Sequence, residues 1–173
     1  MIDVANKWTF KQKISLTKSE NLQKLVQFYV WETPVKKTSV RGVSFNELGW
    51  NKGSYNTLHA RMRKSSGFPN EKWISTSAGK IKESLRELNR LDSFDDSYEF
   101  AIHTVKNGLN KTEALFYLIR NSFAHGGFKT SKSKGAVYYV FENRQGEQLK
   151  GRAVIREATL LDWISIVKKG PNG

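Results

Sequence analysis

The chain has 173 residues, no cysteine and a formal net charge of +13. An apolar content of 38%, with ten Phe, six Tyr and five Trp, predicts a folded domain with a real core and excludes a disordered chain. The lack of cysteine excludes disulfides, thiolate metal sites and cysteine nucleophiles. No signal peptide or bilayer-length apolar run is present, so we expect a cytoplasmic protein, and its cationic field favours polyanions such as nucleic acid.

The N-terminal part predicts one extended segment and one helix. Apolar and polar residues alternate from Met1 to Leu16, as in an extended arm or a short edge strand. Thr17 and Glu20 have the spacing of a capping box, and the apolar residues after them recur at helical spacing up to Tyr29. The pattern predicts a helix from about Lys18 to Trp31.

Residues 35–77 predict an irregular basic insertion. Ser44 and Glu47 form a second capping-box pattern, and Ser54 is placed to cap a short helix that reaches Met62. Two short helices over residues 45–64 would resemble a helix-turn-helix reading head. The alternative is an irregular segment that touches RNA backbone or only solvent.

Three helices are predicted next, over residues 77–91, 94–107 and 111–125, each with one apolar stripe. Asn110 is the expected N-cap of the third, with Glu113 in its first turn, and Gly126-Gly127 is its stop. Short connections between helices favour antiparallel neighbours in a bundle.

The pattern then changes to strands. After a basic loop over Lys129–Lys134, Ala136–Phe141 and Leu149–Arg156 are rich in β-forming residues and flank the turn of residues 143–146. They predict a hairpin, followed by a closing helix over Thr159–Lys168. We expect one domain over residues 1–173, in which residues 1–76 are an N-terminal helix and basic extension, 77–127 hold the core helices, and 128–173 hold the hairpin and last helix.

Three polar residues end the predicted helix of residues 111–125: Arg120, Asn121 and His125. Asn121 and His125 share a helix face, whereas Arg120 lies about 140° around from His125 and needs its long side chain to approach it. RNA cleavage without a metal requires a base for the 2′-hydroxyl, an acid for the leaving 5′-oxygen and a cation for the phosphorane. A His that titrates near neutrality serves as base or acid, and Arg binds phosphate oxygens.

The segment Arg120-Asn121-Ser122-Phe123-Ala124-His125, led by a hydrophobic helix and followed by two glycines, resembles the ribonuclease motif of the HEPN superfamily. The resemblance implies an antiparallel helical bundle, which the helices from Ser77 to His125 fit, whereas residues 1–75 and the hairpin look like additions to it. We therefore expect a mainly α fold: a HEPN-like antiparallel helical bundle with a C-terminal β-hairpin and closing helix, and the irregular basic insertion near residues 35–77. It also implies a homodimer that cuts RNA without a metal, in which the second copy supplies the second proton-transfer group. Many such proteins belong to toxin–antitoxin, abortive-infection or other anti-phage systems, so an antitoxin or defence-complex partner is expected.

We therefore predict a metal-independent endoribonuclease with Arg120 as the phosphate cation, Asn121 as the orienting group and His125 as base or acid. The basic side chains expected to hold RNA are Lys36, Lys37, Arg41, Arg61, Arg63, Lys64, Lys129 and Lys132. Scattered histidines without paired carboxylates, and the lack of a Walker-type loop, predict no metal and no cofactor.

Two other interpretations fit the same residues. The protein could be a non-catalytic HEPN-like nucleic-acid-binding or regulatory subunit, which would bind DNA through residues 45–64. Alternatively the motif is structural: either Arg120 pairs with an acid such as Asp96 or Glu99 and His125 only ends a helix, or the Arg120/His125 helix is buried at a homodimer interface for stability alone.

Overall fold

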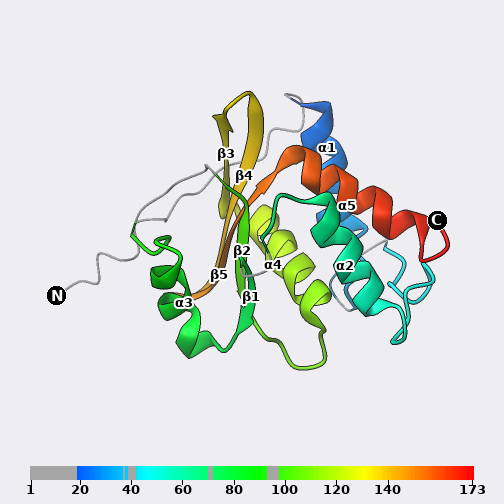
Figure 1. The fold of residues 1–173 in the computed structure, drawn as a ribbon, viewed down its shortest axis with the longest axis horizontal. Coiled ribbons are helices and arrows are strands. Elements are labelled where there is room, and N and C mark those ends of the chain that lie inside the picture. The colour runs from blue at the N-terminus through cyan, green and yellow to red at the C-terminus, as the bar shows by residue number, and fades with distance from the viewer. Residues whose placement is uncertain (1–18, 37, 39–41, 70–71, 93–97) are drawn as a thin grey trace.

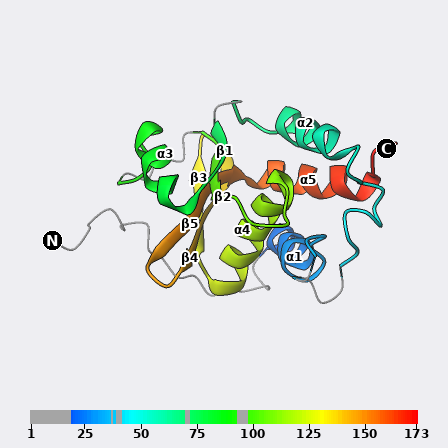
Figure 2. The same ribbon diagram turned by 90° about the horizontal axis from the view of Figure 1, so that it is seen from below.

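The computed structural model describes residues 19–36, 38, 42–69, 72–92 and 98–173. In this part of the chain a five-stranded sheet carries helices on both faces (Figures 1 and 2). Its strands, in the spatial order β1-β2-β5-β4-β3, are β1 Trp73–Thr76, β2 Phe100–Thr104, β5 Gln148–Arg156, β4 Ala136–Gln145 and β3 Phe128–Ser133. β1 and β2 are parallel, and every other neighbouring pair is antiparallel.

This mixed α/β architecture corrects the predicted mainly α bundle. One face of the sheet carries α1 Glu20–Val26, α2 Tyr55–Ser65, α4 Lys111–His125 and α5 Glu157–Lys169 (Figure 2). The other face carries α3 Ile81–Glu87, which follows the short 3₁₀ turn η4 Ala78–Lys80. A π-helical turn, η2 Gln27–Trp31, continues α1.

The inner strands are buried on both faces. On β2, Ala101 packs into the core under α4, while Phe100 and Ile102 pack into the core under α3. The alternation continues across the sheet, because Ala101 pairs with Ala153 of β5, and Phe100 pairs with Val154. Two hydrophobic cores result, and the larger one lies between the sheet and the α4 side.

The helix predicted over residues 94–107 is wrong where the structure describes it. Phe100 to His103 are all buried and belong to strand β2. A central strand with both faces covered has no polar side, so its sequence is a continuous apolar run. Periodicity alone does not distinguish such a run from a buried helix.

Two further strands replace predicted irregular segments. β1 lies within the expected basic insertion and pairs with β2, a contact between distant parts of the chain. β3 takes most of the segment expected as a basic loop, Lys129–Lys134. β3 is an edge strand, and charged side chains are common on edges because they hinder pairing with other chains.

Several local predictions are confirmed. Helix α4 has the predicted bounds, residues 136–156 form a hairpin, and α5 closes the fold. The turn predicted over residues 143–146 is wrong, because β4 continues to Gln145 and the chain turns at Gly146 and Glu147. The helix expected over residues 77–91 is present but shorter, as η4 and α3. The first helix begins after Ser19, whose hydroxyl accepts from the Leu22 N–H. The Thr17 cap and the arm of residues 1–16 lie outside the described residues.

The segment proposed as a DNA-reading head does not form two helices. Ser44 and Glu47 make the reciprocal bonds of a capping box, but these close only a turn over residues 45–49. Helix α2 does form, and its Leu58 and Met62 are buried in the main core. Trp163 of α5 donates to the Met62 carbonyl at 2.9 Å, so α2 is an integral layer of the domain.

Candidate functional site

Helix α4 carries the three residues of the sequence motif, and both of its ends are fixed. Asn110 Oδ1 accepts from the Glu113 N–H at 2.9 Å, and Glu113 returns a bond to the Asn110 N–H, which completes the capping box. Gly126, with φ of 71°, ends the helix in the left-handed region. A side chain on Gly127 would collide with the carbonyl oxygen of Glu142 on β4. The chain therefore turns directly from His125 into β3.

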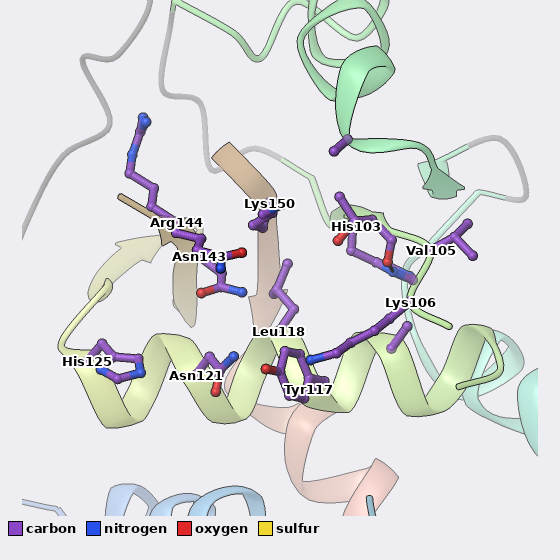
Figure 3. A pocket seen from close by; sticks show the side chains of 14 residues that line it. His103, Val105, Lys106, Tyr117, Leu118, Asn121, His125, Asn143, Arg144 and Lys150 are labelled. Carbon is purple, nitrogen blue, oxygen red and sulfur yellow. Dashed lines mark hydrogen bonds between the residues drawn. The ribbon is translucent and has the colours of Figure 1, made fainter. Parts of the chain in front are cut away.

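One face of α4 lines a pocket, whereas the apolar side chains of α4 pack into the larger hydrophobic core. The buried apolar side chains that fix its rotation are Leu115, Phe116, Ile119 and Phe123. Gly151 of β5 has no Cβ, which lets Leu118 lie against that strand. Tyr117, Asn121 and His125 recur every four residues, and Figure 3 shows them in one row along the helix.

A pocket of about 570 Å³ lies along this row (Figure 3). Its other walls come from the end of β2 and the connection that follows, from the end of β4, and from β5. Three cationic side chains line it, Lys106, Arg144 and Lys150, and among the described residues of its lining none is Asp or Glu. Since the lining is cationic and His125 is exposed, the pocket suits an anionic ligand.

Arg120 lies beside the pocket and does not line it. Its Nη1 donates to Asn121 Oδ1 at 3.0 Å, so Arg120 is connected to the pocket lining through Asn121. Glu99, one proposed structural partner for Arg120, instead binds Arg156, and the other, Asp96, lies outside the described residues.

Asn121 is only 8% exposed and has a defined orientation. Since its oxygen accepts from Arg120, its amide nitrogen is the group left to donate elsewhere. An amide N–H at the pocket wall is a suitable donor to a phosphate oxygen.

Tyr117 is a pocket residue that sequence reasoning missed. The Nζ of Lys106 lies 3.3 Å from the centroid of its ring. Hydrogen bonds from Lys106 and Asn121, together with the positive charges of Lys106 and Arg120, lower the pKa of the Tyr117 hydroxyl. Its four-residue spacing from Asn121 is a signal that the sequence contained.

The second imidazole of the pocket, His103, is sealed and neutral. It is 1% exposed, and burial lowers its pKa to about 4. Trp73 Nε1 donates to its Nε2 at 3.2 Å, so Nδ1 carries the hydrogen and donates to the Thr104 carbonyl at 3.3 Å. Both ring nitrogens are therefore occupied. His59 lies outside the pocket, against the ring of Trp73, and burial also lowers its pKa to about 4.

Arg144 owes its position to a buried carboxylate. Glu142 is 6% exposed and accepts from Arg144 Nε at 2.7 Å and from Arg152 Nε at 2.8 Å. Arg152 is fully buried and also donates to the Leu91 carbonyl. Glu142 offsets part of this positive charge, so Lys106 and Lys150 are the two cations of the lining that do not pair with it.

The basic residues predicted to hold RNA do not gather at this pocket. Lys36, Lys64 and Lys132 are exposed in separate parts of the chain, Arg63 and Lys129 are half-buried, and Lys37 and Arg41 lie outside the described residues. Arg61 has a structural role. Its guanidinium donates to the carbonyls of Gly170 and Pro171 and lies over the ring of Trp50.

The cations that do line the pocket come from three separate elements, and no local pattern marks them. Lys106 follows β2, Arg144 lies next to the last residue of β4, and Lys150 lies on β5.

Among the described residues, no three His, Cys, Asp or Glu side chains gather as a metal site would require. No helix in the described ranges combines the length and apolar character needed to cross a bilayer.

Comparison of the chain with protein-family models, with curated proteins and with solved structures found no match.

Proposed function

We propose that the pocket beside α4 binds the backbone of RNA and that the protein cleaves it without a metal ion. The observation that carries this proposal is the combination of an exposed imidazole, His125, with Lys106 and Lys150 in a pocket whose described lining holds no carboxylate. Lysine ammonium groups occupy the role that a divalent cation has in metal-dependent nucleases.

The charge of the whole molecule supports the choice of a polyanion. A net charge of +13 steers RNA to the surface, and each phosphate contact releases counterions. Within the pocket, the same charges favour the phosphorane over the ground state, since the phosphorane carries one more negative charge.

The motif residues then have distinct roles. The imidazole of His125 accepts the 2′-hydroxyl proton as the 2′-oxygen bonds to phosphorus and the bond to the 5′-oxygen breaks. The Asn121 amide donates to a phosphate oxygen, held in orientation by Arg120, whose charge lies next to it. The products are a 2′,3′-cyclic phosphate and a 5′-hydroxyl.

Sequence resemblance gives separate support, limited to the segment of residues 110–127. The R-N-x₃-H pattern is one that HEPN ribonucleases share, whereas the mixed sheet differs from the bundle that the resemblance implied. A homodimer, an antitoxin or defence-complex partner and a role in phage defence are proposals that rest on this segment alone.

The direct test is incubation of the purified protein with total RNA and with tRNA. We expect products ending in 2′,3′-cyclic phosphate, formed equally with and without a chelator. His125→Ala should abolish cleavage, whereas His59→Gln, which changes an imidazole outside the pocket, should retain it. Cleavage by the His125→Ala variant, or strict dependence on added Mg²⁺, would contradict the proposal.

Binding in the pocket has its own test. Replacing Lys106 and Lys150 by Gln should lower the salt dependence of single-stranded RNA binding by a slope of about 1.4, since each phosphate contact contributes about 0.7. The matched control replaces Lys80 and Lys134 by Gln, because both are exposed and neither lines the pocket. This control variant should keep most of the salt dependence of RNA binding. An unchanged slope in the first pair would exclude the pocket as the RNA site.

A second candidate function is nucleic-acid binding without catalysis. It is favoured by the state of His103, which is sealed and neutral and leaves His125 as the exposed imidazole of the pocket. A gel shift at controlled salt, with duplex DNA beside single-stranded RNA, separates the candidates. Binding without any RNA products would support this one.

A further inference from the structure

The proposed RNA cleavage needs a second proton-transfer group, because one imidazole does not readily serve as base and acid in a single step. His103 does not qualify, since it is 1% exposed and both of its ring nitrogens are engaged. The remaining hydroxyl with a shifted acidity in the pocket belongs to Tyr117. A role for Tyr117 in proton transfer rests on the proposed ribonuclease function.

Tyr117 and His125 lie on either side of Asn121. The three residues occupy successive turns of α4, so the two outer Cα atoms are about 12 Å apart along the axis. Figure 3 shows the Tyr117 hydroxyl turned along the helix toward Asn121, on the side where His125 lies. Because the tyrosine side chain is long and turned this way, its hydroxyl lies closer to the His125 side chain than the separation of the two Cα atoms suggests. A phosphate placed opposite Asn121 has the imidazole on one side and the phenol on the other.

The hydrogen bonds around Tyr117 leave its proton for a ligand. Lys106 has only donor hydrogens, and the Asn121 oxygen already accepts from Arg120, so neither neighbour offers the Tyr117 hydroxyl a free acceptor. The O–H hydrogen of Tyr117 is therefore left to be donated to a ligand in the pocket that the tyrosine lines.

We propose that Tyr117 is the general acid that protonates the leaving 5′-oxygen. As the bond between phosphorus and the 5′-oxygen breaks, that oxygen takes the phenol proton, and the 2′-hydroxyl proton goes to His125. The phenolate is stabilised by the Lys106 ammonium beside it and regains a proton from solvent or from the His125 imidazolium. Atoms and charge balance without any added reagent.

The charged surroundings favour this role. Lowering the pKa of a phenol from its usual value near 10 toward the working pH makes it a stronger acid. Among the described residues, the titratable and charged side chains that line the pocket are Lys106, His125, His103, Arg144 and Lys150, with Arg120 beside the lining. The carboxylate of Glu142 lies behind Arg144 and is paired with Arg144 and Arg152. Burial holds His103 neutral, and the described lining contains no carboxylate that would favour retention of the phenol proton.

The test uses the variant Tyr117→Phe with two RNA substrates that differ at one atom. In one the leaving atom is the natural 5′-oxygen, and in the other it is sulfur. Thiols ionise at about pH 8.5, so a thiolate leaves without a proton. Tyr117→Phe should slow cleavage of the oxygen substrate by about 10²–10³-fold and cleave the sulfur substrate at nearly the wild-type rate. His125→Ala should be slow on both.

Two controls separate chemistry from structure. Tyr117→Phe should bind a non-cleavable 2′-deoxy substrate as tightly as the wild type and unfold at a similar temperature, since the ring is kept. Tyr55→Phe removes a half-buried phenol hydroxyl outside the pocket and should alter the cleavage rate of neither substrate. A structural role for the Tyr117 hydroxyl would slow both substrates equally.

The outcomes distinguish this inference from the function on which it rests. If the wild type cleaves RNA and Tyr117→Phe is equally fast, or is slow on both substrates, Tyr117 is not the acid and the ribonuclease proposal stands. If the wild type cleaves neither substrate, the ribonuclease proposal fails and this assignment fails with it.

Discussion

The junction between α4 and β3 sets the position of His125, and Gly127 is the residue that permits it. The Gly127 N–H donates to the Ser122 carbonyl at 2.8 Å, and its own carbonyl accepts from the Glu142 N–H at 2.7 Å. A Cβ at this position would meet the Glu142 carbonyl oxygen well inside contact distance. Both groups are backbone, so no side-chain rotation relieves the clash. Gly127→Ala must therefore shift β4 or the end of α4.

Overpacking of this kind costs about 2–3 kcal/mol of the free energy of unfolding. In a domain of this size, each kcal/mol lowers the melting temperature by about 2–4 °C, so Gly127→Ala should melt about 4–12 °C below the wild type. Differential scanning calorimetry measures this, with urea unfolding as a second assay. Gly79→Ala is the matched control, because a Cβ there meets nothing within 4 Å. Melting of both variants at the wild-type temperature would refute the close approach of Gly127 to β4.

Three further predictions concern buried charge, pH and the motif. Glu142→Gln leaves the buried Arg152 without its carboxylate partner and should cost about 3–5 kcal/mol in urea unfolding, against little change for the exposed Glu83→Gln. Burial lowers the pKa of His103 to about 4, below the unfolded value of 6.5, so its contribution to stability is present above pH 6.5 and is lost as the pH falls from 6.5 to 4. That loss approaches about 3 kcal/mol for His103, and His59, whose pKa burial also lowers to about 4, contributes in the same range. Melting curves of His59→Gln across this range should still show the loss, whereas a flat profile in that variant would mean that His103 is not buried neutral. Arg120→Ala should lower single-turnover RNA cleavage by about 10²-fold with Arg120→Lys in between, because the Asn121 amide loses the donor that orients it, and equal rates in all three proteins would exclude that role.

Elements with local signals were predictable from the sequence. Helix α4 is specified within a few residues at each end, by the Asn110–Glu113 capping box and by Gly126. The hairpin of β4 and β5 is likewise a contact between neighbours in the chain. In each case the residues that determine the element lie inside it or next to it.

Elements that depend on distant partners were not predictable. β2 is apolar on both faces because α3 covers one and α4 the other, and its own sequence does not distinguish that from a buried helix. β1 exists as a strand through its parallel pairing with β2, across an intervening helix. β3 depends on β4 and has the charged composition of an edge. Once these three strands were missed, a bundle was the consistent interpretation of the remaining helices.

The residues of the candidate site were likewise predictable only where the sequence carries a local signal. Asn121 and His125 were found because they lie close together at the end of one predicted helix, in a segment that resembles a known motif. Their four-residue spacing extends to Tyr117. The cations of the pocket were missed, because the sheet order brings the ends of β2, β4 and β5 beside α4. In their place, sequence reasoning selected Arg61, whose charge is engaged by the carbonyls at the C-terminus.

The pocket walls help to decide whether the polar end of α4 is a simple helix cap or part of a ligand site. An Arg-Asn pair followed by a His at the end of an amphipathic helix is compatible with a polar cap, and the sequence did not exclude that interpretation. The two interpretations differ in what they require of the pocket walls, because a helix cap needs no cationic side chains opposite it. Here Lys106 and Lys150 lie across from the row of Tyr117, Asn121 and His125, and neither has a carboxylate in the described lining. Lys106 contacts the ring of Tyr117, but no carboxylate of the described lining neutralises either lysine. This cationic lining supports the proposal of an anionic ligand.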